Sequence, residues 1–204
     1  MVWSRSLDNE LGRLTQGFRN QVKGTDTMEF IPKQNVPQDR KVTYSNFVCD
    51  YRPLKSEPFR VRMTVGGDKL EYPDETASPA ASLIETKLII NCVISDHSKF
   101  NSKFCAIDLK DFFLKTPMTR PEFLRIHSRY LSPDFRTEYK LNDLIDSDGY
   151  VYFQVNKGMY GLKQAAILAY KLLVQRFKNR GYYPIPLTTG LFKHKTRSTV
   201  RSLH

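Results

Sequence analysis

Two aspartates mark the apolar stretch "CAIDLKDFFLKTPM" at residues 105–118. Asp108 lies between Ile107 and Leu109, and Asp111 follows three positions later. An ionised carboxylate is costly to bury, so a chain that places one in an apolar strand must have a use for it. Three uses are common: a ligand of a hard cation such as Mg²⁺, a general base, or the partner of an arginine.

The spacing of Asp108 and Asp111 limits which of these roles the two residues could share. Three residues apart on one strand, the two carboxylates would point to opposite faces, so they share a site only if the chain turns after Leu109. No histidine is near enough in sequence to support a Ser-His-Asp type of catalysis. A structural role, as a cap or as an arginine partner, stays open for Asp108, and local capping is the favoured interpretation of Asp111.

A second stretch with chemical potential is "KGMYGLKQAA" at residues 157–166. Two glycines bracket Met-Tyr, and the chain then enters a helix that carries Lys163 and Gln164. A helix N-terminus beside a lysine suits a phosphate group, and a glutamine amide suits a sugar hydroxyl or a base edge. A glycine turn before a helix is common, so this stretch alone does not define a function.

The distribution of charge points to a polyanionic partner. The chain has 32 Lys and Arg against 21 Asp and Glu, a formal net charge of +11, and its last acidic residue is Asp148. Between 149 and 204 there are only basic charges, which favours nucleic acid as a partner. The alternative is a basic surface that is simply solvated.

Composition sets the broad class. Hydrophobic residues make up 40% and aromatic residues 12% of 204 residues, enough for a packed core. The three cysteines are far apart, with no CxxC and no histidine cluster, which argues against a disulfide framework or a zinc site. No apolar stretch is long enough to span a bilayer, and the first residues lack a signal-peptide core. We expect an intracellular protein, cytoplasmic or nuclear, that is not secreted and has no membrane partner.

The pattern of the first hundred residues predicts three segments. Residues 1–40 are polar and mixed, which indicates an extended arm with one short helix at its start. Residues 41–66 alternate as a β-hairpin turning around Pro53–Pro58, with two arginines on one face of its second strand. A helix follows, capped by Ser78 with Pro79 in its first turn. Its apolar run, from Leu83 to Ile94, predicts packing on more than one side.

The second half predicts a sheet and a strong helix. Residues 103–109 read as a short strand that carries Asp108, followed by a turn or short helix at 110–118. Residues 122–127 and 149–155 read as two further strands. Apolar residues at helical spacing over 162–177, followed by Gly181, predict a helix and its end. The fold class is α+β, an antiparallel sheet backed by helices.

Together and in order, these stretches resemble the reverse transcriptase of copia-type retrotransposons. The matching stretches are "RVRMTVGGDKLEYPDETASPAASLIETKLIINCVI", "FCAIDLKDFFLKTPM" and "VNKGMYGLKQAAILAYKLL", in which the motif Tyr-Gly-Leu-Lys-Gln is intact at 160–164. The resemblance spans roughly residues 3–193, and its agreement in order and spacing is more specific than any one motif.

The resemblance implies the fingers and partial palm of a right-hand polymerase at 41–193, after the arm at 1–40 and before a basic, disordered tail at 194–204. Its partners would be an RNA or DNA template–primer and a deoxynucleoside triphosphate. It implies that Asp108 is the catalytic residue that holds two Mg²⁺ ions beside the primer hydroxyl and the incoming triphosphate.

The resemblance also assigns the remaining site residues. Arg62 would contact the triphosphate, with Arg60 the weaker candidate. Phe113 would lie under the sugar and exclude a 2′-hydroxyl, and Gln164 would contact the sugar, with Lys163 beside it. Contacts to nucleic acid are expected from three basic residues: Lys157, Lys171 and Arg176.

One element of the family's pattern is absent from this sequence. Polymerases of this type need an Asp-Asp pair on a hairpin soon after the second helix, and no acidic residue follows Asp148. One aspartate cannot hold two divalent ions, so the magnesium site is expected to be incomplete. We therefore expect a polymerase fragment that is inactive alone and needs a second chain to supply the missing palm. The alternatives are a non-catalytic binder of nucleic acid or of a retroelement particle, and the product of a decaying gene.

Overall fold

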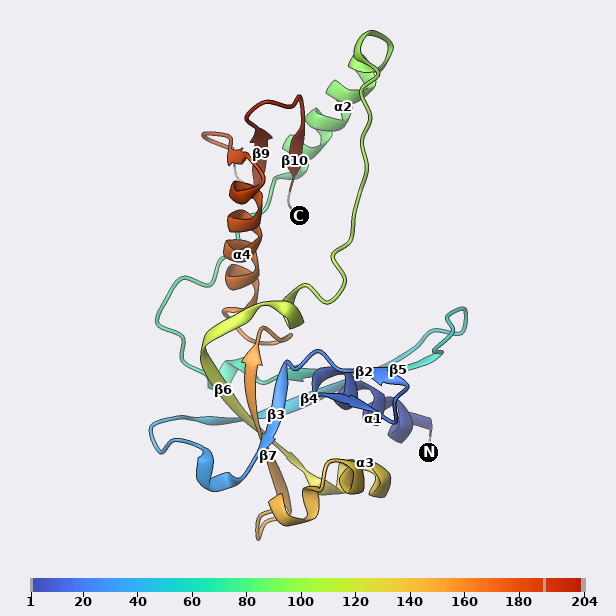
Figure 1. The fold of residues 1–204 in the computed structure, drawn as a ribbon, viewed down its shortest axis with the longest axis vertical. Coiled ribbons are helices and arrows are strands. Elements are labelled where there is room, and N and C mark those ends of the chain that lie inside the picture. The colour runs from blue at the N-terminus through green and yellow to red at the C-terminus, as the bar shows by residue number, and fades with distance from the viewer. Residues whose placement is uncertain (1, 189, 203–204) are drawn as a thin grey trace. The chain divides into compact units, whose positions relative to one another are not determined.

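The computed structural model describes residues 2–188 and 190–202, which form two compact units (Figure 1). Unit 1 comprises Met1–Thr76 and Asp111–Leu168, and unit 2 comprises Ala77–Lys110 and Ala169–His204. Both contain helices, and each of the two has its own β-sheet. The predicted α+β class is therefore confirmed.

Unit 1 is built on a five-stranded sheet. In spatial order its strands are β3 (Met28–Ile31), β7 (Tyr150–Lys157), β6 (Pro117–His127), β4 (Val42–Tyr51) and β5 (Phe59–Val65). All neighbours are antiparallel except β4 and β6, which are parallel. The predicted purely antiparallel sheet is wrong at this one pairing. A long connection separates β4 from β6 in sequence, and parallel pairing requires a long connection.

The predicted hairpin and the two further predicted strands of this sheet are confirmed. Strands β4 and β5 form the expected hairpin, and β6 pairs with β7. On β5, the side chains of Val61, Met63 and Val65 are buried, whereas Arg60 and Arg62 alternate with them and are more exposed. This alternation is the period-two pattern of a strand with one face on the core.

The helix predicted at the start of residues 1–40 is present, but the rest of this segment packs into unit 1, so the predicted extended arm is wrong. Helix α1 (Val2–Leu14) buries Leu7, Leu11 and Leu14, which recur at helical spacing. Two short strands follow, β1 (Gly17–Phe18) and β2 (Val22–Lys23), and then β3 joins the main sheet. The residues between these leucines are mostly polar, so the helix has a single apolar stripe along one face.

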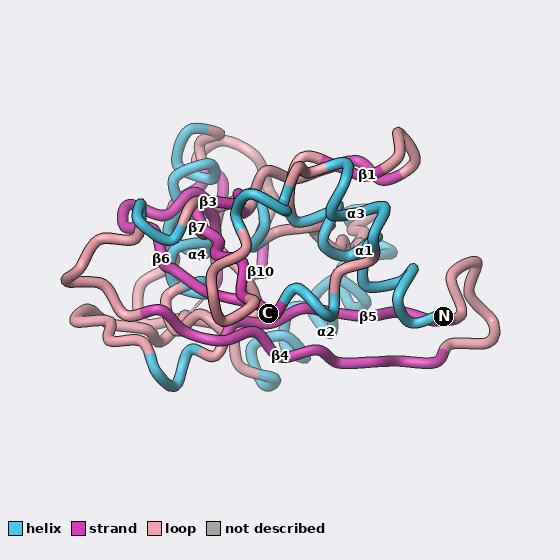
Figure 2. The backbone as a smooth tube through the Cα atoms, turned by 90° about the horizontal axis from the view of Figure 1, so that it is seen from below, coloured by secondary structure: helices cyan, strands magenta, loops and turns pink. Residues whose placement is uncertain are grey.

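Helix α1 covers the free edge of β5, as Figure 2 shows. The Ser6 hydroxyl accepts a hydrogen bond from the Val61 N–H at 2.8 Å and donates to the Phe59 carbonyl at 3.0 Å. One turn later, the buried Glu10 carboxylate accepts from the Met63 N–H at 3.2 Å. Two side chains of α1 thus replace the neighbouring strand that an edge strand lacks.

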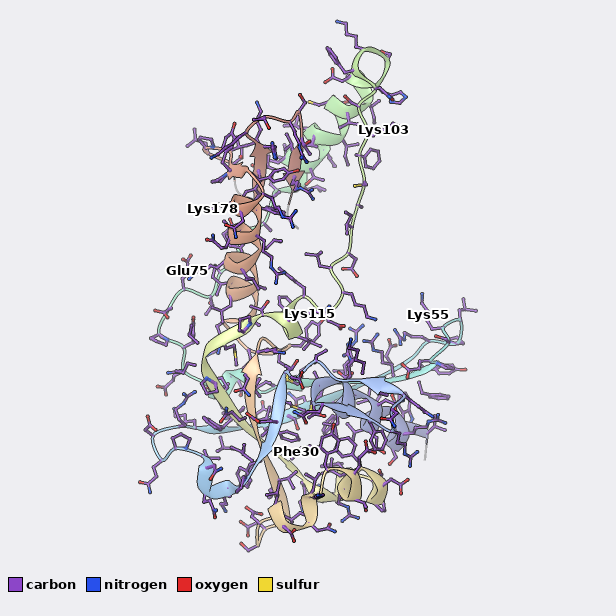
Figure 3. The ribbon with its side chains drawn as sticks, viewed as in Figure 1. Phe30, Lys55, Glu75, Lys103, Lys115 and Lys178 are labelled. Atoms are coloured by element: carbon purple, nitrogen blue, oxygen red, sulfur yellow. The ribbon has the colours of Figure 1, made fainter. Side chains whose placement is uncertain are left out.

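The core of unit 1 lies between the sheet and the helices α1 and α3 (Pro133–Glu138), the latter capped by the Ser132 side chain. Its fully buried residues include Phe135 and Phe153, and Phe30 packs among the aromatic rings there (Figure 3). Short 3₁₀ turns connect the elements at Lys33–Asn35, Gly67–Lys69, Phe113–Lys115, Ser128–Tyr130 and Leu141–Leu144. The turn at Phe113–Lys115 confirms the turn or short helix predicted there.

Unit 2 contains helix α2 (Leu83–Phe100), most of α4 (Ala165–Asn179), and a three-stranded antiparallel sheet. The strand order is β10 (Val200–Ser202), β9 (Leu191–His194), β8 (Tyr182–Pro184). Gly181, at φ +82°, follows the end of α4, as predicted. Residues 200–202 are paired in this sheet, so the disordered tail predicted at 194–204 is wrong for them; residues 203–204 lie outside the described residues. No helix in the described ranges is both long enough and apolar enough to cross a membrane.

Three further predictions for unit 2 are wrong. Helix α2 begins after Ser82, because Ser82 and Glu85 form a reciprocal capping box four residues beyond the predicted Ser78 cap. None of its residues is buried, so the wide apolar run does not reflect packing on several sides. Residues 103–109, where a strand was predicted, have neither helix nor strand. A short apolar run forms a strand only where a neighbouring strand offers backbone partners, and none pairs with this segment.

The close approach of the Gly161 backbone to strand β5 gives the first testable prediction. Gly161 has φ +94°, and a Cβ there would lie 2.0 Å from the Val65 carbonyl oxygen. Gly161→Ala should therefore lower the free energy of unfolding by about 2 kcal/mol or more, measured by urea denaturation. Gly149→Ala is the matched control. Its φ is +83°, but its added Cβ would meet only the His127 ring, and we expect a loss of about 1 kcal/mol. Equal losses in the two variants would contradict the backbone crossing.

Candidate functional site

The end of β5 and the turn before α4 are held together by their backbones. The Val65 N–H donates to the Tyr160 carbonyl at 2.8 Å. A Cβ on Gly67 would lie 2.0 Å from the Gly161 carbonyl oxygen, so only glycine allows the two chains to approach this closely. Two stretches about ninety residues apart in sequence, "TVGG" and "MYGLKQ", therefore form one corner of unit 1.

Phe113 belongs to the same corner. Its ring meets the Tyr160 ring edge to face, with centroids 5.5 Å apart, and a Cβ on Gly158 would lie 2.9 Å from its carbonyl oxygen. Phe113 is half-buried, whereas Tyr160 is 44% exposed. The corner thus presents an aromatic surface in which the exposed Tyr160 ring packs on the half-buried Phe113 ring.

Lys163 and Gln164 are engaged with the protein itself. The Lys163 Nζ donates to the Leu70 carbonyl at 3.0 Å, and this contact ties the start of α4 to the turn after β5. The Gln164 side chain is buried and donates from Nε2 to Glu122 Oε1 at 3.1 Å. These contacts give both residues a role in positioning the corner. Their contacts with a nucleotide remain predictions.

Glu122 is the centre of a buried polar network that sequence reasoning missed. Its side chain is 3% exposed, and it forms ion pairs with Arg40 at 2.8 Å and with Arg120 at 3.3 Å, besides accepting from Gln164. Three donors compensate the cost of burying this carboxylate. The available signal was an acid at the start of an apolar strand, "PEFLRIH".

The arginine face of β5 is electropositive. Arg62 is exposed and Arg60 is half-buried. Desolvation, and then the positive charges of Arg13 and Arg62, lower the pKa of Arg60. These three guanidinium groups therefore lie close enough to repel one another, and an anion placed among them would relieve that repulsion.

Asp111 is a partner of one of these arginines. Its Oδ1 accepts from Arg13 Nη1 at 3.0 Å, and Arg13 also pairs with Glu10 at 2.8 Å. The predicted local capping role of Asp111 is wrong, because its side chain binds a cation 98 residues away. Its backbone φ of +56° directs the chain into the following turn.

Asp108 lies in unit 2, in the segment 101–109 that has no helix or strand, and it is exposed. The interpretation of Asp108 as a carboxylate buried in a strand is therefore wrong. In the described ranges, no group of three or more His, Cys, Asp or Glu side chains could hold a metal ion. A single exposed carboxylate does not fit a two-ion magnesium site. Metal binding by Asp108 remains a prediction.

The three residues predicted to contact nucleic acid fall in different surroundings. Lys157 is half-buried and donates from Nζ to the Thr25 carbonyl in unit 1. Lys171 and Arg176 are exposed on the part of α4 that belongs to unit 2. Lys157 therefore contributes to the internal structure, and the other two are free to meet a ligand.

Comparison of the chain with protein-family models, with curated proteins and with solved structures found no match in any of the three. A function is therefore inferred from the residues and their geometry.

The Glu122 network gives a second prediction. Glu122→Ala leaves Arg40, whose side chain is 14% exposed, without its carboxylate, and should lower the free energy of unfolding by about 3–5 kcal/mol. Glu71→Ala is the matched control, because it removes the exposed pair with Lys41 and should change the stability far less. Both are measured by urea denaturation at pH 7. A loss for Glu122→Ala as small as that of the control would show that the network does not hold the corner.

Proposed function

We propose that this chain is part of an RNA-directed DNA polymerase of the copia type, and that the corner of unit 1 handles the incoming nucleotide. One observation carries the proposal. The stretches that resemble the reverse transcriptases, around Val65, Phe113 and Tyr160–Gln164, are distant in sequence and meet at this corner. Convergence of separate motifs is expected of a functional site and is not required by packing alone. In this proposal, unit 1 contains the fingers and part of the palm.

The chemistry of the corner suits a deoxynucleoside triphosphate. Arg62 presents an exposed guanidinium on the strand that leads to the corner, and guanidinium groups bind phosphate through paired hydrogen bonds. Phe113 and Tyr160 supply an apolar surface for a deoxyribose. In this proposal Phe113 restricts the space beneath the sugar, and Gln164, held by Glu122, positions the turn that carries Tyr160.

In this proposal the chain binds the nucleotide and the template. It does not contain all the groups that nucleotidyl transfer requires. The resemblance requires a second carboxylate pair for the metal ions, and no residue between 149 and 204 is acidic. A partner segment would have to supply those carboxylates. We therefore derive no metal-dependent step from these residues.

The test is triphosphate binding by the Arg62→Ala variant. Calorimetry with an RNA template annealed to a DNA primer that ends in a dideoxynucleotide measures binding without extension. Loss of hydrogen bonds to a charged group should weaken affinity for the complementary triphosphate roughly 10-fold or more. Lys55→Ala is the matched control, since Lys55 lies at the tip of the same hairpin (Figure 3) and its loss should change affinity less than about 2-fold. Equal affinities for Arg62→Ala and the wild-type chain would refute the assignment.

A second candidate function is non-catalytic binding of nucleic acid. It is supported by the exposed position of Asp108 and by the exclusively basic charges after residue 148. Under this alternative, an RNA–DNA hybrid binds with steep salt dependence, the complementary triphosphate adds nothing, and Asp108→Ala binds like the wild-type chain. Magnesium-dependent primer extension that disappears in Asp108→Ala would exclude it.

A further inference from the structure

Unit 2 contains a pocket of about 390 Å³ beside the end of α4. It lies between the last turn of that helix and the three-stranded sheet, and its lining comes from two separate segments, 173–182 and 197–201. Its lining includes four arginines and two aromatic rings: Arg176, Arg180, Arg197, Arg201, Phe177 and Tyr182. A pocket of this volume is large enough for one nucleotide unit.

The positive charge of this pocket is not compensated within the protein. None of its arginines forms an ion pair with a carboxylate of the described chain, and all four are exposed. No acidic residue occurs between 149 and 204, so no sequence neighbour can neutralise them. Four guanidinium groups around one concavity repel one another, and a bound anion removes that repulsion. The pocket is therefore selective for negative charge.

The aromatic rings orient one of these arginines. The Arg201 guanidinium lies over the Tyr182 ring at 4.8 Å and over the Phe177 ring at 5.6 Å from their centroids. A guanidinium stacked on a ring keeps its N–H donors in its own plane, where they remain available for a bidentate contact with a tetrahedral oxyanion. Stacking also lowers the entropy that Arg201 would lose on binding, which favours affinity.

We propose that this pocket binds the phosphate group of a single-stranded nucleic acid, with exposed basic side chains of α4 following the strand beyond it. Nucleic acid is favoured because exposed Lys171 and Lys178 continue the positive surface along α4, as a chain of phosphates requires. Figure 3 shows Lys178 on α4. All the residues that line the pocket belong to unit 2, so this proposal does not depend on the nucleotide-binding corner of unit 1.

The experiment measures fluorescence anisotropy of a labelled twelve-nucleotide oligodeoxythymidine with the full chain. Arg180→Ala/Arg197→Ala removes two pocket arginines whose side chains make no ion pair in the described chain, and unfolding is not expected. We expect at least a 10-fold loss of affinity and a decrease of about two in the slope of log affinity against log salt. Lys193→Ala/Lys195→Ala removes the same charge from the same unit outside the pocket lining and should cost less than 3-fold.

Competition identifies the group that is bound. Deoxythymidine 5′-monophosphate should displace the oligonucleotide, whereas deoxythymidine should not, and vesicles containing anionic phospholipid should compete no better than neutral vesicles. Equal losses in the two double variants would show a diffuse basic surface and overturn the proposal. Preferential displacement by anionic vesicles would overturn it in favour of a lipid headgroup. Triphosphate binding is measured in the same variants. It should depend on Arg62 and not on Arg180 or Arg197, so a failure of one proposed site can be told from a failure of the other.

Discussion

The free edge of strand β5 is the constraint on which unit 1 depends. An edge strand has a row of N–H and C=O groups without strand partners, and leaving them unpaired inside a protein costs free energy. Ser6 and Glu10 of α1 satisfy the edge at Val61 and Met63, and the turn at Tyr160 satisfies it at Val65. One strand therefore fixes both the N-terminal helix and the turn that opens α4. The arginine face of β5 and the aromatic corner are positioned by the same three hydrogen-bonded contacts.

The buried carboxylates of unit 1 serve this architecture. Glu10 accepts from the backbone of β5 and also pairs with Arg13, and Glu122 joins Arg40 to Gln164. Because these acids are already paired inside, they do not offset the basic charges on the surface. The residual positive charge is therefore exposed, on the face of β5 in unit 1 and around the pocket in unit 2. Acidic side chains paired inside the protein, together with basic side chains exposed on its surface, favour anionic ligands.

The two proposed sites use the same physical device in different ways. In unit 2 a guanidinium group stacks on aromatic rings, whereas in unit 1 Arg62 is exposed on the strand that leads to the aromatic pair. In unit 1 the rings of Phe113 and Tyr160 pack on each other. In unit 2 the rings support Arg201 directly. The first arrangement favours a sugar beside a phosphate, and the second favours an oriented phosphate contact.

Local pattern was sufficient for the elements whose signal is carried by neighbouring residues. Alternation predicted the β4–β5 hairpin with its two arginines on one face, and helical spacing with Gly181 predicted α4 and its end. The helix at the start of residues 1–40 was predicted but its packing was not, because its narrow apolar stripe is stabilised only by the β5 edge that it covers. The strand predicted around Asp108 did not form because a strand requires a partner, and sequence does not say which partner is present.

The sequence by itself determined the residue chemistry: an excess of basic charge, two glycine stretches, and single carboxylates in apolar surroundings. Only the tertiary structure decided which of these groups meet. It joined Gln164 to Glu122, Asp111 to Arg13, and four arginines around one pocket, because such contacts depend on how distant segments pack. A carboxylate has the same letter whether it is buried and paired, like Glu122, or exposed, like Asp108. Its surroundings, set by packing, decide which it is.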